Sequence, residues 1–186
     1  QSIYLGTVPN NLDTSSSSLG SQNTVLGINT LKNNTSGWRN TAIGNGALRE
    51  NNTGISNVAI GVMSLQNNTN GNSNVAIGVE ALQNNTNGNY NTAIGRDVLT
   101  QNSTGDYNVV IGNEALKSIT DGNDNVVLGS FAGLRDINGN LLSKVDNSVL
   151  LGHGTKPKST NGNNEIVIGY TALGEGSNTA VLGNDN

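Results

Sequence analysis

Three aromatic residues stand at nearly the same point of a recurring motif, where their ring faces could bind a ligand. Tyr90 and Tyr107 each lie five residues before a glycine that ends an apolar triplet, and Trp38 lies six residues before its own. Aromatic faces flanked by asparagine amides can stack on sugar rings and hydrogen-bond their hydroxyls. Alternatively, the two tyrosines form a stacked pair that only supports a corner of the chain. Under either interpretation we expect Tyr90 and Tyr107 to be neighbours.

Asp136, Asn138 and Asn140 form a second candidate binding site. They surround Asn138-Gly139, a dipeptide typical of tight hairpin turns. We expect a hairpin that protrudes and presents these side chains to a partner. Their alternate spacing is similar to the start of a calcium loop, but the later acidic ligand is missing. The sequence therefore predicts no metal site here, and it predicts no cofactor elsewhere.

No group of residues predicts catalysis. The chain has no cysteine, and its single histidine, His153, lies in a glycine-containing segment expected to be an exposed loop. Glycan cleavage requires paired carboxylates. Glu80, Asp97 and Glu114 recur two residues after successive glycines, and we interpret them as an exposed, solubilising row. We expect that the protein is not an enzyme.

The composition excludes an ordinary globular core and two classes of partner. Only 33% of the 186 residues are hydrophobic, while 25 are glycine and 35 are asparagine, which is too little apolar material for a deep core. The net charge is -4 and the nine Lys and Arg are mostly isolated, which argues against nucleic-acid binding. Apolar runs of four or five residues are too short to insert into a membrane.

A 17-residue repeat must position all of these side chains. Seven apolar triplets end in glycines exactly one period apart, at Gly27, Gly44, Gly61, Gly78, Gly95, Gly112 and Gly129. Similar glycines at 6, 152, 169 and 183 bring the expected coil count to eleven. Each regular unit continues with a leucine and an asparagine-rich turn, which predicts a strand, a corner, a short second strand and a long polar corner. Stacked copies of such a unit form an all-β parallel solenoid.

The repeat also predicts the organisation of the chain. We expect an irregular lead-in over residues 1–19, regular coils over 20–129, an inserted hairpin over 130–147 and further coils over 148–186. In Val58-Ala59-Ile60 the outer side chains point to one face and the middle one to the other. We expect the alanine and leucine rows to form an exposed apolar surface that threefold association covers. A monomeric solenoid is the alternative.

The triplets resemble a known family. Val58-Ala59-Ile60-Gly61 and Val75-Ala76-Ile77-Gly78 are similar to the core motif of the left-handed parallel β-roll in heads of trimeric autotransporter adhesins. Similar repeats occur in phage tail fibres, upstream of a chaperone domain that trimerises the fibre and then cleaves itself off. The end of the chain, residues 178–186, resembles the segment leading into that domain, which implies a processed product or a fragment.

The resemblance implies a homotrimeric attachment fibre that binds a host cell-surface receptor or glycan. We expect it in a virion, as part of a tail fibre, with the head of a bacterial surface adhesin as the alternative. A glycan-degrading enzyme on a solenoid is a less favoured hypothesis. An ice-binding solenoid is disfavoured because the row with threonine at 41 and 92 has valine at 58, 75, 109 and 126, which breaks the regular threonine array.

Overall fold

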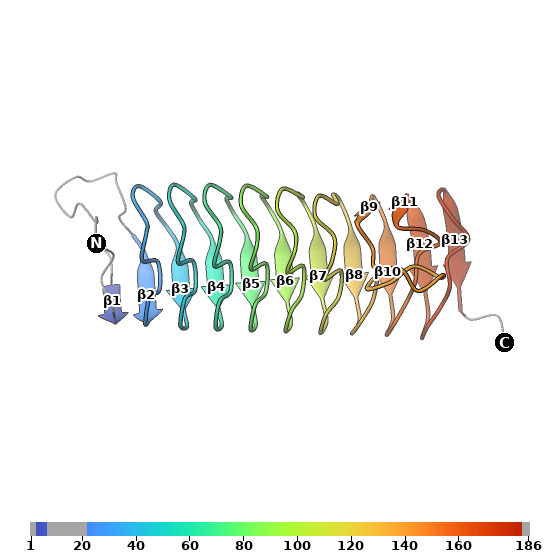
Figure 1. The fold of residues 1–186 in the computed structure, drawn as a ribbon, viewed down its shortest axis with the longest axis horizontal. Helices are drawn as coiled ribbons and strands as arrows, with labels where there is room; N and C mark the ends of the chain where they lie inside the picture. The colour runs from blue at the N-terminus through green and yellow to red at the C-terminus, as the bar shows by residue number, and fades with distance from the viewer. Residues whose placement is uncertain (1–2, 7–21, 184–186) are drawn as a thin grey trace.

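The computed structural model describes residues 3–6 and 22–183, which form a straight rod of stacked coils (Figure 1). Eleven strands make one parallel sheet along the rod, in the order β1-β2-β3-β4-β5-β6-β7-β8-β10-β12-β13, and β9 pairs with β11 in a second, two-stranded sheet. The strands are β1 (Ile3–Gly6), β2 (Thr24–Gly27), β3 (Thr41–Ile43), β4 (Val58–Ile60), β5 (Val75–Ile77), β6 (Thr92–Ile94), β7 (Val109–Ile111), β8 (Val126–Leu128), β9 (Lys144–Asp146), β10 (Val149–Leu151), β11 (Asn161–Asn163), β12 (Glu165–Ile168) and β13 (Thr179–Leu182).

The pairing register confirms the parallel β-solenoid and its 17-residue coil. Ala59 of β4 pairs with Ala76 of β5, and Ala76 pairs with Ala93 of β6. Most of the predicted lead-in over 1–19 lies outside the described residues, apart from β1. Within 3–6 and 22–183 there is no helix, and hence none that could cross a membrane.

The core corrects the expected assignment of the two strand faces. The alanine and leucine rows are not exposed: Ala59, Ala76, Leu65 and Leu82 are fully buried. The outer residues of the triplets face outward instead and are half-buried or exposed, as in the burial pattern of β4 and β7. A narrow coil has room for one inward-facing strand residue packed against a leucine, such as Ala59 or Val110, so the outer two residues of each triplet lie outside.

The second short strand expected around the leucine is absent from the regular coils. Leu65 lies in a turn with a φ of 48°, and Met63 and Ser73 in the same coil have φ of 58° and 56°. Positive φ is uncommon for residues other than glycine. Each regular coil thus turns at three left-handed positions, and backbone hydrogen bonds to the neighbouring coils hold them, as from Leu65 N to Ala81 O and from Met63 N to Asn45 O, both at 2.9 Å.

Buried asparagines join the coils. Asn57 lies before β4, and its backbone N–H donates to Oδ1 of Asn40 at 2.9 Å, while its own Nδ2 donates to Gly71 O at 2.8 Å. A second ladder runs through the polar corner, where Asn68 Nδ2 donates to Asn51 Oδ1 at 2.8 Å. These hydrogen bonds satisfy the buried asparagine amides and the backbone groups beside them, which are shielded from water.

The glycine after each strand is required by the close stacking of coils. Gly78 has a φ of 135°, and a Cβ there would overlap the carbonyl oxygen of Gly95 in the next coil. A side chain would therefore be strained by its backbone conformation and would also push the two coils apart.

Candidate functional site

Tyr90 and Tyr107 form the expected stacked pair. Their ring centroids are 5.0 Å apart and their planes differ by 4°. Both are more than half exposed, and both have positive φ, of 57° and 58°. Bulky residues in this conformation are unusual and mark positions where the side chain is held against a backbone preference. The stack supports its corner and also presents an aromatic surface, so both interpretations of the pair stay compatible with the geometry.

Trp38 does not share the register of the tyrosines, whereas its neighbour Arg39 does. The Arg39 guanidinium lies 4.2 Å from the Trp38 ring centroid, and its Nε donates to Gln22 Oε1 at 3.1 Å. Trp38 itself is half-buried. A search for aromatic residues does not identify Arg39. Counting back from Tyr90 in steps of 17 residues does.

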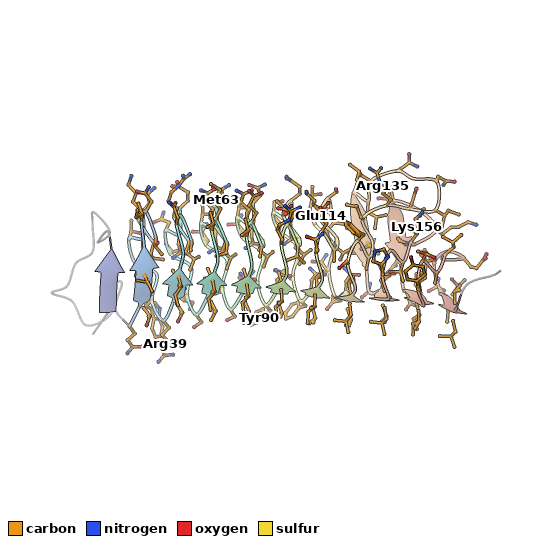
Figure 2. All side chains as sticks on the ribbon, turned by 90° about the horizontal axis from the view of Figure 1, so that it is seen from below. Arg39, Met63, Tyr90, Glu114, Arg135 and Lys156 are labelled. Atoms are coloured by element: carbon orange, nitrogen blue, oxygen red, sulfur yellow. The ribbon has the colours of Figure 1, made fainter. Side chains whose placement is uncertain are left out.

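Arg39, Ser56, Ser73 and Tyr90 therefore occupy one row along the rod, one residue in each of four consecutive coils. In Figure 2, Arg39 and Tyr90 lie along one edge of the rod, and Met63 and Arg135 lie along the opposite edge. Arg39, Ser56 and Tyr90 are exposed and Ser73 is partly exposed. We call this set the Arg39–Tyr90 row.

Asp136, Asn138 and Asn140 come together in a hairpin over the Asn138-Gly139 turn. Arg135 and Leu141 pair antiparallel at its base. The carboxylate of Asp136 is buried within the loop: Oδ1 accepts the backbone N–H groups of Asn138 and Asn140, both at 2.9 Å, and Oδ2 accepts Asn140 Nδ2 at 3.1 Å. Burial acts to raise the pKa of Asp136, but the hydrogen bonds from Asn140 and Asn138 outweigh it and lower the pKa.

The hairpin therefore uses its carboxylate for its own backbone and presents the exposed Asn138 and Asn140 amides. In the part of the chain that the structure describes, no three His, Cys, Asp or Glu side chains are close enough to hold a metal ion.

The row of Glu80, Asp97 and Glu114 is less exposed than expected. Asp97 is buried, and Glu80 and Glu114 are half-buried. Lys117 Nζ lies 3.3 Å from Asp97 Oδ2, and Arg96 Nη2 lies 3.3 Å from Glu114 Oε1. Asp97 and Glu114 thus join coils through ion pairs with neighbouring cations.

Glu165 is a fully buried carboxylate at the ladder position that asparagine fills in earlier coils. Its oxygens accept the backbone N–H groups of Lys158, at 3.2 Å, and Gly176, at 2.9 Å. Glu165 thus links the backbone at Lys158 to the backbone at Gly176. This link lies at the last complete coil, which has 14 residues in place of 17.

A second aromatic cluster lies near the C-terminal end of the rod. His153 is exposed, as expected, but it is stacked on Tyr170, with centroids 5.3 Å apart, and meets Phe131 edge-on at 5.6 Å. Sequence reasoning misses this cluster, although His153 and Tyr170 each follow a strand-ending glycine and are 17 residues apart.

Comparisons of the chain with protein-family models, with curated proteins and with solved structures find no match.

Proposed function

We propose that this chain is a structural and receptor-binding segment of a homotrimeric attachment fibre, carried by a virion as part of a phage tail fibre or a similar fibre. In this role it contacts glycans on the host cell surface and catalyses no reaction. The head of a bacterial trimeric surface adhesin is the alternative setting, because the same repeat serves both. The resemblance of the Val-Ala-Ile-Gly triplets to those fibres supports the assignment and implies a left-handed coil.

The observation that carries the proposal is the apolar outer face of the main sheet. Outward-facing side chains recur in each coil along the rod, and several expose more than a third of their surface: Leu26, Val109, Ile111, Val126, Leu128 and Leu182. Monomeric soluble proteins rarely expose a continuous apolar face of this kind. Threefold association through the valine and isoleucine rows would cover it, in place of the alanine and leucine rows first expected.

Glycan contact is supported by the polar corners, which stay outside such an interface. One edge of the rod carries the exposed aromatic rings of Tyr90 and Tyr107, and the hairpin at Arg135 on the opposite edge carries the exposed amides of Asn138 and Asn140 (Figure 2). Aromatic rings suit the apolar faces of sugars, and exposed amides suit their hydroxyl groups.

The mass of the assembly in solution tests the trimer. We expect three times the 19.2 kDa chain mass by analytical ultracentrifugation at micromolar concentration. Ile111→Lys places a charge on the outer face without entering the core, and we expect it to yield folded monomers. Thr104→Lys, on an exposed polar corner, is the matched control and should remain trimeric. A monomeric wild-type chain would contradict the proposal.

A further inference from the structure

We propose that the Arg39–Tyr90 row binds an acidic oligosaccharide laid along the rod axis, with the acidic group at Arg39 and a sugar face on Tyr90. This inference rests on the proposed glycan contact and adds the class of glycan, its direction and the residues that recognise it.

The row is a regular array because its backbone repeats. The φ angles of Arg39, Ser56, Ser73 and Tyr90 are 57°, 58°, 56° and 57°. Ser56 N donates to Trp38 O, Ser73 N to Ile55 O and Tyr90 N to Asn72 O, each at 3.0 Å. Side chains on equal backbones leave the rod in the same direction, about 4.8 Å apart. Arg39 and Tyr90 are thus separated by about 14 Å, a span for a short oligosaccharide.

One end of the row offers an aromatic face. Tyr107, in the following coil, stacks on one face of Tyr90. The opposite face of Tyr90 is directed towards the preceding coil, where the residue in register is the small Ser73. A sugar ring can therefore stack on that face without meeting a large side chain.

The middle of the row offers free hydroxyls. Among the residues that the structure describes, the side-chain hydroxyls of Ser56 and Ser73 make no hydrogen bond, while their backbone N–H groups are used in the stack. A hydroxyl both donates and accepts, so these two groups can pair with sugar hydroxyls of either orientation.

The other end offers a positive charge with no acidic partner. Arg39 is exposed, and within the described ranges it forms no ion pair with a carboxylate. Trp38 and Gln22 hold its guanidinium in place. A fixed guanidinium binds carboxylates through paired hydrogen bonds.

The residue beyond the tyrosine pair sets the direction of the ligand. Asp124 follows Tyr107 in the same register and is exposed. Its carboxylate repels an acidic group at that end, whereas Arg39 attracts one at the other. The row therefore distinguishes acidic from neutral glycans, and it also distinguishes the two orientations of an acidic one.

Binding of a hyaluronan hexasaccharide and of its carboxyl-reduced form tests the inference on the assembled full chain. Trp38 is the chain's only tryptophan and contacts Arg39, so its fluorescence reports on the row, with calorimetry as an independent readout. We expect the acidic form to bind about tenfold more tightly, since hydrogen bonds to charged groups are worth more than neutral ones.

Serine substitutions separate the two ends of the row, because serine already occupies this register at 56 and 73. Arg39→Ser should reduce the affinity for the acidic form about tenfold, to that of the reduced form, and leave the latter unchanged. Tyr90→Ser should weaken both forms. Tyr170→Ser, which removes an exposed tyrosine from the other aromatic cluster, is the control and should change neither.

Equal binding of the two forms by the wild-type chain, or no effect of Arg39→Ser, would overturn the inference and leave glycan contact standing. If neither form binds, the inference also falls. An array of neutral and acidic glycans then decides the proposed function separately: capture of other glycans retains it, and no capture of any glycan counts against it.

Discussion

At the scale of single residues, asparagine replaces much of the apolar core that this chain lacks. Asn68 is fully buried and makes three side-chain hydrogen bonds: Nδ2 donates to Asn51 Oδ1 and Gly71 O, and Oδ1 accepts Asn85 Nδ2. The ladder ends at Asn102, whose buried Oδ1 has no hydrogen-bond partner in the described structure. The reason is the next coil, where the buried Ile119 stands at the ladder position.

An asparagine at the end of the ladder should therefore contribute less to the free energy of unfolding than one in the middle. We expect Asn68→Ala to lower the free energy of unfolding by about 2 to 4 kcal/mol, because it leaves the buried Asn51 Oδ1 and Gly71 carbonyl without this donor. Asn102→Ala removes a residue with one unsatisfied oxygen and should cost about 1 kcal/mol less. Urea unfolding of the two variants at equal concentration measures the difference, and equal costs would contradict this account of the ladder.

At the scale of elements, the hairpin is stabilised by one carboxylate. The sequence predicts this turn from Asn138-Gly139 and proposes Asp136 as a possible ligand for a partner. The folded chain turns that carboxylate inward, where three donors hold it. The turn depends on adjacent residues, so the sequence can predict it. The direction of the Asp136 side chain depends on the folded backbone around it, so the sequence alone cannot predict that.

The low pKa of Asp136 predicts how the hairpin responds to acid. A carboxyl group with a lower pKa in the folded chain than its ordinary value of 3.8 stabilises the fold above that value. This stabilisation is lost as the pH falls through the folded pKa. We expect the backbone amides of Asn138 and Asn140 to be protected from hydrogen exchange near neutral pH and to lose this protection in acid.

NMR measures the protection of the Asn138 and Asn140 amides from neutral pH into acid, with a correction for the intrinsic pH dependence of exchange. Asp136→Asn is the matched variant: its protection should be weaker at neutral pH and should show no step in acid. A wild-type hairpin whose corrected protection stays constant into strong acid would show that the carboxylate does not hold the loop.

At the scale of the whole molecule, the rod is close to a one-dimensional stack. Each strand of β2 to β8 pairs only with the coils before and after it in the chain. In such architectures the stability is approximately a sum over units and their interfaces. Whole coils should therefore be removable, whereas parts of a coil should not.

Deletion of residues 62–78 tests this property. It joins Gly61 to Val79 in register, so we expect a folded rod that is shorter by about 4.8 Å. X-ray scattering measures the length and circular dichroism the strand content. Deletion of residues 62–70 shifts every later side chain out of register and should prevent folding, so equal behaviour of the two deletions would contradict the one-dimensional stack.

The same repeat explains what the sequence alone could determine. The period of 17 fixes which residues stack, because equal backbones one coil apart must pair in register. It therefore predicts the solenoid and the Tyr90–Tyr107 stack, and both are present.

The tertiary structure decided what periodicity leaves open. Strand alternation separates two faces but does not say which one lies inside. In the closed coil the middle residue of each triplet packs against the leucines, whether it is Ala59 or Val110, and the outer valines and isoleucines face outward. The period likewise places Arg39, and not Trp38, in register with Tyr90, but only the tertiary structure shows that Trp38 and Gln22 contact the Arg39 guanidinium. Whether a side chain is available to a partner or is used within its own chain depends on how the backbone of the coil folds around it, and the repeat period does not specify this.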